Sequence, residues 1–344
     1  MFASWSTLEL LAAFTLAAVV VLFSGLRITG LADHLADRLR IGEAIAGAVL
    51  LGAATSLSGT IVSITVAFDG FASLAYSNSI GGIAAQTAFL AIADVIYRKA
   101  NLEHAAADLG NIFQAVVLVV LLTLPLLAIT LTEFTVFAIH PVSLVIPVIY
   151  VGALLTTRTL RKAPMWLPVA TGDTRKDTPE REDADTRRKG TARLFLEFFL
   201  LMLLMGVSGW VIAKTAGAIT VRMTLSESLV GALATAVATS LPELVTTIAA
   251  VRRGALQLAV GGIIGGNTFD TLFLTAADVA YREGSLYHAA GAGDQFWNLT
   301  AILMTGILLG GLILRQRKGP GRIGAESLAI LVVYVGAISL QLMN

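Results

Sequence analysis

Two acidic residues lie inside long apolar stretches, where a charged side chain is costly. Glu243 follows Pro242 in the segment ATSLPEL, and Asp270 ends the glycine-rich segment GGIIGGNTFD. A carboxylate in the middle of a bilayer costs several kcal/mol unless it is paired or functional. Two carboxylates among hydroxyl and carbonyl oxygens would form an all-oxygen site. Such sites suit hard cations such as Ca²⁺, Na⁺ or H⁺ rather than soft metals.

The residues around Glu243 supply further oxygen atoms. Pro242 has no N–H group, so the carbonyl of Ala238, four residues earlier, loses its helical partner. Free carbonyls at membrane depth survive only around a cavity or a bound ion. Thr239 lies one helical turn from Glu243 on the same face. We therefore predict that this helix is interrupted near its middle and that the interruption contributes ligands.

The segment that carries both acids has a counterpart 184 residues earlier in the chain. The two copies align without a gap, from about 41–106 and from about 225–290. Polar residues agree along the whole alignment, which chance similarity between two apolar helices does not produce. The chain is therefore a tandem repeat.

The first copy keeps the hydroxyl groups and loses the acids. Its segments read ATSLSGT and SIGGIAAQ, so Gly59 stands opposite Glu243 and Gln86 stands opposite Asp270. Thr55, with Ser56 beside it, and the Gln86 amide remain as possible ligands. We expect the first half to add neutral oxygens to a site whose charge comes from the second half.

The bulk composition explains how such acids can lie in apolar surroundings. The chain has 344 residues, 56% of them hydrophobic and 14% charged, with a mean hydropathy of +0.81. A water-soluble domain of this length needs more polar surface, so lipid is the expected solvent. The absence of cysteine excludes disulfides, thiolate metal sites and cysteine nucleophiles.

A membrane-spanning helix needs about 20 mostly apolar residues. Ten stretches meet this requirement, at 5–25, 42–67, 72–97, 111–131, 139–157, 193–213, 225–251, 255–281, 296–314 and 324–342. The long polar segment in their middle, 158–192, has mixed charge and cannot form an apolar core. We therefore predict an all-α membrane protein with five-helix halves at 1–157 and 193–344, joined by a charged linker.

The placement of basic residues predicts the orientation. Most of the 24 lysines and arginines fall in the linker and in the loops on its side of the membrane. Basic loops face the cytoplasm, so the linker is expected inside and both termini outside. An odd number of helices per half then inverts the second copy in the membrane. Inverted-topology repeats are typical of transporters that open alternately to each side.

The motifs TSLPE (239–243) and GGNTFD (265–270) resemble the second α-repeat of the cation/calcium exchanger superfamily, and the first repeat matches more loosely. The superfamily includes sodium–calcium and proton–calcium exchangers. The resemblance covers both repeats and the ten-helix arrangement. It implies a cation site lined by side chains of both repeats and completed by carbonyls near 52 and 236. The predicted ligands are Glu243, Asp270, Thr239, Ser240, Thr55, Ser56, Gln86, Gly52, Ala236 and Asn267.

Three departures from the family pattern affect the expected ion. Gly59 occupies the position of the first-repeat glutamate, and Gly82 and Gly266 occupy the positions of two serines that help to bind Na⁺ or Ca²⁺. Ca²⁺ prefers six to eight oxygen ligands, so its affinity is expected to fall. The expected function is antiport of Ca²⁺ or another divalent cation against Na⁺ or H⁺. Antiport of K⁺ or Na⁺ against H⁺ is the alternative.

The acidic residues also have structural interpretations. Glu243 could be a protonated carboxyl hydrogen-bonded within a helix bundle, and Asp270 could join two helices. The pairs Asp94/Arg98 and Asp278/Arg282 have i,i+4 spacing near helix ends and favour interfacial salt bridges. A gating or proton-relay role for these aspartates is the alternative.

A channel, or a relative that no longer transports, is the competing class of function. The sequence carries no H-E-x-x-H motif and no G-x-S-x-G motif with a plausible partner, so an enzyme is not expected. The expected partners are inorganic cations and the lipid bilayer, with no cofactor and no nucleic acid. The expected location is the cell's inner (plasma) membrane, as a multi-pass protein.

Overall fold

The computed structural model describes residues 2–39, 52–97, 99–106, 108–174, 190–320 and 323–343. Within these ranges the chain forms helices joined by turns and short loops, with one isolated β-bridge between Val136 and Ile139. The predicted all-helical membrane fold is confirmed at this level.

Eight helical runs of the described residues are long and apolar enough to cross a membrane. They are α1 (Thr7–Leu39), α5 (Ala72–Ile96), α7 (Leu109–Thr130), α8 (Val142–Lys162), α10 (Thr191–Met223), the run α11–η3–α12 (Glu227–Arg253), α16 (Ala292–Leu314) and α17 (Ala325–Met343). The number of crossings, the side on which the termini lie and the boundaries of the two halves stay predictions.

The other two expected spans are broken helices. Of the span at 42–67, the described part is α3 (Gly52–Thr55) and α4 (Leu57–Phe68), separated at Ser56. The span at 255–281 is divided at Thr271 into α13 (Leu256–Asp270) and α14 (Leu272–Ala280). Irregular backbone at membrane depth persists where protein buries it or where it lines a cavity. Both breaks therefore mark the region in which polar groups gather.

The helix that carries Glu243 is irregular at a different place from the one predicted. We expected an interruption at Pro242, but α12 (Ala236–Arg253) continues through this proline. The irregular turn comes earlier, as a π-helical segment η3 at Val230–Thr235. A proline removes one backbone hydrogen bond and a packed helix can absorb that loss, whereas a π-turn inserts an extra residue and often occurs at functional sites.

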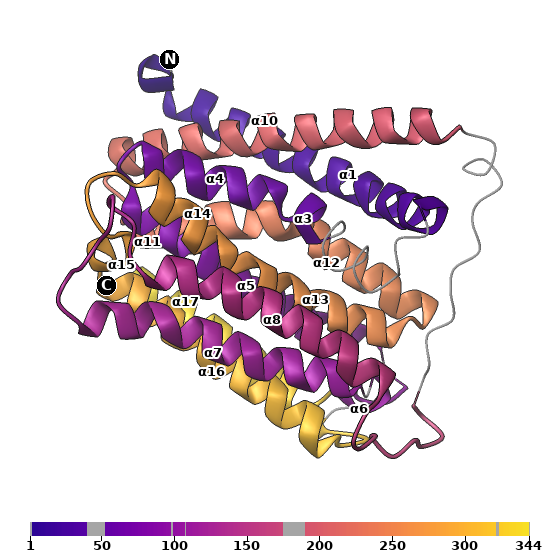
Figure 1. Cartoon of the computed structure of the whole chain (residues 1–344). Helices are drawn as coiled ribbons and strands as arrows, with labels where there is room; N and C mark the ends of the chain where they lie inside the picture. Colours follow the sequence, from indigo (N-terminus) through magenta and orange to yellow (C-terminus); the bar gives the residue numbers. More distant parts are fainter. Residues whose placement is uncertain are drawn as a thin grey trace.

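Helices α1 and α10 lie side by side along one face of the bundle, and α5 runs through its interior (Figure 1). In the most apolar stretch of α5, 83% of the residues are buried, compared with 33% in α1 and 22% in α10. Small residues allow this close packing. A Cβ atom at Gly81 of α5 would come 2.4 Å from the backbone of Ala232.

Two glycines bring α1 and α10 directly onto the repeat motifs. A Cβ atom at Gly25 would lie 2.6 Å from the Pro242 ring, and one at Gly209 would lie 2.7 Å from the Ser58 carbonyl oxygen. Gly25 and Gly209 are 184 residues apart, and so are Ser58 and Pro242. Helix α1 thus contacts the second copy as α10 contacts the first. The repeat therefore extends beyond the predicted segments and includes the preceding helix of each half.

Asp278 fixes a helix junction and does not use its expected arginine. Its carboxylate accepts hydrogen bonds from the Leu286 amide (2.9 Å), the His140 amide (2.8 Å) and the Ser143 hydroxyl (2.6 Å). Arg282 instead donates to the backbone carbonyls at 279 and 137. The i,i+4 salt bridge expected here is therefore wrong, because backbone and hydroxyl donors already surround the buried carboxylate.

Asp94 repeats this arrangement in the first half. It accepts hydrogen bonds from the Leu102 amide (2.7 Å) and the Gly324 amide (2.8 Å). Both partners stand 184 positions from the corresponding backbone partners of Asp278. Its expected partner Arg98 lies outside the described residues. The matching bonds extend the structural repeat to the starts of α8 and α17.

Candidate ion-binding site

Four polar side chains meet between the two halves, one each from α5, α12, α13 and the break between α3 and α4. Asp270, at the end of α13, accepts a hydrogen bond from the Ser56 hydroxyl (2.8 Å) and another from the Gln86 amide (2.7 Å). The Gln86 amide also lies 3.2 Å from the Ser240 hydroxyl of α12. All four residues are buried. We call Ser56, Gln86, Ser240 and Asp270 the central quartet.

The central quartet has the symmetry of the repeat. Ser56 corresponds to Ser240 and Gln86 to Asp270, in each case 184 residues apart. The bond from Ser56 to Asp270 is therefore matched by the bond between Ser240 and Gln86. The Gln86–Asp270 bond joins two equivalent positions, so the pseudo-two-fold axis of the protein passes through it. An amide facing a carboxylate gives a complementary pair, whereas two carboxylates at this point would repel each other.

Glu243 lies buried in α12, three residues after Ser240. The Thr55 hydroxyl at the end of α3 is a hydrogen-bond partner of its carboxylate, while its Oε2 atom has no hydrogen-bond partner. Thr239 donates to the carbonyls of Thr235 (2.9 Å) and Ala236 (3.2 Å). The Thr239 hydroxyl, which we predicted as a ligand, therefore already donates its hydrogen to the backbone.

Buried acceptor atoms without donors surround this region. Gln86 Oε1, Glu243 Oε2 and Asn267 Oδ1 are all buried and lack a hydrogen-bond partner. The two amide oxygens can only accept, a carboxyl oxygen donates only when it is protonated, and buried acceptors are rarely left unpaired. A bound cation would satisfy them. The residues present therefore fit a cation with oxygen ligands.

The remaining predicted ligands are placed as follows. Asn267 donates to the Thr87 hydroxyl (3.0 Å), which ties α13 to α5. The carbonyl of Ala236 accepts the Thr239 hydroxyl, and Gly52 is the first residue of α3. Hydrogen bonds join the members of the central quartet to one another, and Thr55 is a hydrogen-bond partner of Glu243. Which of these oxygens coordinate an ion stays a prediction.

Phe273 fills the place left by the missing glutamate of the first repeat. A Cβ atom at Gly59 would lie 2.7 Å from Cε2 of this buried ring. The Gly59 carbonyl accepts a hydrogen bond from the Asn78 amide (3.2 Å). The sequence does not mark Phe273 or Asn78, because an isolated aromatic residue or amide in an apolar helix has no distinctive spacing.

The two glycines at the expected serine positions lie directly beside the central quartet. A Cβ atom at Gly82 would lie 3.6 Å from the Ser240 hydroxyl and 3.9 Å from the Asp270 carboxylate. One at Gly266 would lie 3.3 Å from Gln86 Oε1. The loss of both serine hydroxyls therefore removes oxygen atoms next to the quartet without filling the space with apolar side chains.

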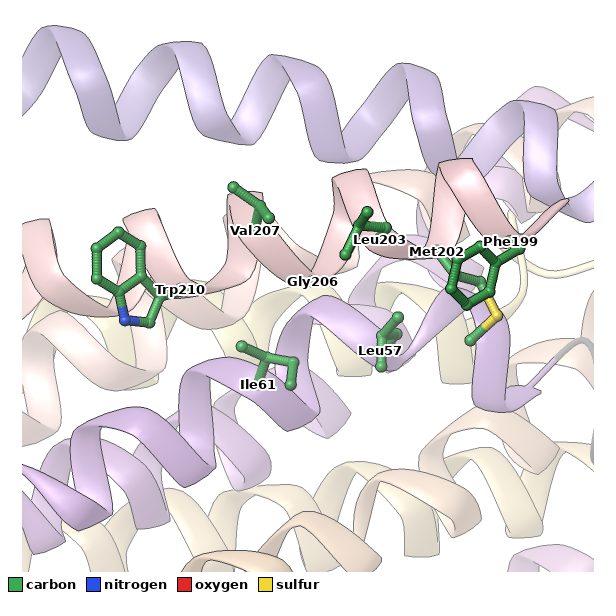
Figure 2. A pocket seen from close by; sticks show the side chains of 8 residues that line it. All are labelled: Leu57, Ile61, Phe199, Met202, Leu203, Gly206, Val207 and Trp210. Carbon is green, nitrogen blue, oxygen red and sulfur yellow. The ribbon is translucent and has the colours of Figure 1, made fainter. Parts of the chain in front are cut away.

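An apolar groove of about 400 Å³ lies on the other face of the first repeat motif (Figure 2). It runs between α4 and α10 and lacks any ion ligand. Its lining consists of Leu57, Ile61, Phe199, Met202, Leu203, Gly206, Val207 and Trp210. Among the described residues, no group of three or more His, Cys, Asp and Glu side chains is placed to hold a metal. A cation between Glu243 and Asp270 would use these two carboxylates with hydroxyl, amide and carbonyl oxygens.

The sequence matches the family described as sodium/calcium exchanger protein over residues 9–157 and 193–343. The chain belongs to this family. The resemblance predicted from the TSLPE and GGNTFD motifs is thereby confirmed. Family membership makes the chain a multi-pass membrane protein of the ion-exchanger class.

Two relatives by sequence have been described. CaxA of Alkalimonas amylolytica is 26% identical over 321 residues, which cover 92% of this chain and 94% of CaxA. The inner membrane protein YrbG of Escherichia coli is 31% identical over 136 residues. That match spans 40% of this chain and 41% of YrbG.

Solved exchangers share the fold. The H⁺/Ca²⁺ exchanger CAX superposes with a TM-score of 0.65 at 16% identity, covering 97% of this chain and 86% of CAX. The sodium–calcium exchanger NCX_Mj superposes with a TM-score of 0.62 at 16% identity, covering 97% of this chain and 99% of NCX_Mj. At this identity the comparison establishes the fold and leaves the ions open.

We predict that Gly59→Ala destabilises the protein because the new methyl group collides with the Phe273 ring. Overpacking of a filled core typically costs about 1–3 kcal/mol. Thermal unfolding of the purified protein in detergent measures the effect. In a Phe273→Leu background the same change is expected to cost much less. Equal costs in both backgrounds would show that the ring does not fill this position.

Proposed function

We propose that this exchanger is a secondary active antiporter that moves Ca²⁺ or another divalent cation against Na⁺ or H⁺. Its transport site would consist of the central quartet and Glu243. The observation that carries the proposal is the combination of two buried carboxylates with buried acceptor atoms that lack donors. Two carboxylates balance the charge of one divalent cation, and the unpaired amide oxygens of Gln86 and Asn267 supply neutral ligands.

The same charge argument explains why the flux should be an exchange. An empty site with two ionised carboxylates would be a buried and uncompensated charge, which is strongly unfavourable at membrane depth. Protons or Na⁺ ions can replace the divalent cation and keep the site neutral. The ion site is then expected to switch from one side of the membrane to the other only when it is loaded with one type of ion or the other. This requirement couples the two fluxes.

Alternating access would come from α1 and α10 sliding over the rest of the bundle. Both helices lie along one face and are less buried than α5 (Figure 1). Gly25 and Gly209 place their backbones directly on Pro242 and Ser58, next to the ion ligands. A change at the motif can therefore be transmitted to the helix that covers it. The inverted repeat supplies an equivalent contact for each side of the membrane.

A monovalent cation/H⁺ antiporter is the second candidate. The observation that favours it is the Phe273 ring on Gly59, which leaves the first repeat without a carboxylate at this depth. The glycines at 82 and 266 remove two more oxygens. A site with fewer ligands binds Ca²⁺ less well, and K⁺ or Na⁺ would then be the transported ion.

The solved relatives support the same class of ions, since NCX_Mj is a sodium–calcium exchanger and CAX is an H⁺/Ca²⁺ exchanger. The partners proposed for this chain are accordingly inorganic cations, with the bilayer as solvent and no organic cofactor. Residence in the inner membrane, as the name of YrbG states for that relative, is part of the proposal.

We predict that Glu243→Gln strongly reduces coupled flux. The purified protein is reconstituted into vesicles loaded with Na⁺ or with acid, and uptake of radioactive Ca²⁺ is followed. Loss of a charged ligand typically costs about 1.5–3 kcal/mol, so uptake is expected to fall about tenfold or more. Glu283→Gln, a change at an exposed loop position, is the control and should transport normally.

The dependence of each ion's flux on a counter-ion distinguishes the candidate functions. Ca²⁺ uptake that requires the opposing gradient supports the divalent antiporter. No Ca²⁺ uptake, together with K⁺ or Na⁺ that dissipates a pH gradient, supports the monovalent cation/H⁺ antiporter. Ion flux that needs no counter-ion would indicate a channel, and absence of all flux would indicate a relative that no longer transports.

We predict that Gly25→Ala slows transport by about tenfold or more. The added methyl group collides with the Pro242 ring, and strain of about 1–3 kcal/mol in one state shifts the balance between the two access states. Gly30→Ala, on the same helix, is the matched control because a Cβ atom there meets nothing within 4 Å. Equal rates for Gly25→Ala and the native protein would contradict a sliding contact at this glycine.

A further inference from the structure

Two glutamates face each other at the end of the molecule where the linker attaches. Glu103 lies in α6 (Leu102–Ala105), and Glu326 lies in the first turn of α17 (Figure 1). Their carboxyl groups are close enough to interact directly. Both side chains are buried, Glu103 completely. This acid pair, Glu103 and Glu326, belongs to neither the central quartet nor the Glu243 site.

The acid pair has too few donors for two ionised carboxylates. The Ser327 hydroxyl lies 3.4 Å from Glu103 Oε1, a weak contact. Glu103 Oε2 and Glu326 Oε1 are buried and have no hydrogen-bond partner. Among the described residues, neither carboxyl forms an ion pair. One proton between the two groups would turn two unpaired acceptors into a donor and an acceptor.

The charged groups around the acid pair do not neutralise it. Asp94 of α5 adds a further negative charge and is itself bonded to backbone amides. His104 bonds through its ring to the Arg315 carbonyl (2.7 Å) and the Thr171 hydroxyl (2.9 Å). The Arg315 guanidinium, at the end of α16, donates to the carbonyls at 169 and 104 and to the hydroxyl at 174. Both basic groups are therefore directed elsewhere.

Glu326 packs closely against two glycines. A Cβ atom at Gly311 would lie 2.5 Å from Glu326 Cγ, and one at Gly324 would lie 2.8 Å from Glu326 Oε1. Larger residues at these two positions would therefore collide with the glutamate. A proton needs only the two carboxyl groups, whereas Ca²⁺ would need oxygen ligands on all sides.

The second half of the chain provides an internal comparison. It repeats the Asp94 and Ser327 positions as Asp278 and Ser143, but has Tyr287 in place of Glu103 and Val142 in place of Glu326. There the Tyr287 and Ser143 hydroxyls form a hydrogen bond of 2.7 Å. The same junction therefore forms without either acid. The two glutamates are a local addition that the fold itself does not require.

We propose that Glu103 and Glu326 together bind one proton and form a second proton site, separate from the ion-transport site. The shared proton holds α6 against the start of α17. Loss of the proton places two negative charges in contact, next to Asp94, and weakens this packing. The packing at the linker end of the molecule is therefore sensitive to the pH on that side of the membrane.

The direction of the pH effect follows from the environment of Glu103. Burial, and then the charges of Asp94 and Glu326, raise the pKa of Glu103 well above its usual value. A carboxyl whose pKa is higher in the folded state binds its proton more tightly there than in the unfolded chain. Its contribution to stability is therefore fully present at low pH, below the unfolded pKa, and is lost as the pH rises through the folded value.

Thermal unfolding of the full-length protein in detergent between about pH 5 and about pH 9 tests the proposal. The unfolding temperature of the native protein should fall by about 3 °C or more as the pH rises. Glu103→Gln and Glu326→Gln should each make this fall smaller, because an amide donates to the remaining carboxylate as the protonated partner would. Glu283→Gln is the control and should keep the native pH dependence.

Infrared spectroscopy at neutral pH gives an independent readout. The native protein should show the carbonyl stretch of a buried protonated carboxylic acid, and part of this signal should be absent in both variants. A native pH dependence and an unchanged infrared signal in Glu103→Gln and Glu326→Gln would overturn the proposal. If one variant fails to fold, the other decides the result.

Discussion

The hydrogen bond between Gln86 and Asp270 is the contact around which this exchanger is organised. It joins equivalent positions of the two repeats on the pseudo-two-fold axis, inside the apolar interior. A carboxylate there must be paired, and the partner comes from the other half of the chain. The Ser56 hydroxyl, also from the first repeat, makes the second bond to Asp270. The need to satisfy one buried acid thus holds the two halves together where the ion ligands meet.

The two halves share a fold and differ in chemistry. Gly25 and Gly209, like Asp94 and Asp278, make the same contacts in both copies. The two buried acids of the proposed site belong to the second copy alone, and Phe273 occupies the space beside Gly59, the first-copy position opposite Glu243. In the proposed antiporter, the symmetric contacts would serve the movement between two access states. The unequal ligands would determine which ion binds.

Much of this arrangement could be predicted from the sequence. The apolar stretches predicted helices, and the fixed offset of the repeat placed Gln86 opposite Asp270. The hydroxyl-rich segment ATSLSGT predicted an interruption in the first repeat, and the break at Ser56 lies inside it. Features that depend on packing between distant segments could not be predicted. The π-turn before Glu243 has no distinctive residue pattern, and the helix break at Thr271 has no proline or glycine to mark it. The partners of Asp278 lie on other helices, so local spacing suggested an arginine that the carboxylate does not use.

The central claim is that one cation binds between Glu243 and Asp270 on the repeat axis. Anomalous diffraction from crystals soaked in Ca²⁺, recorded at long wavelength, tests this claim most directly. We expect one strong peak about 2.3–2.6 Å from oxygens of both carboxylates, and its loss when Asp270→Asn crystals are treated identically. A peak away from these carboxylates, or one that persists in the variant, would contradict the account.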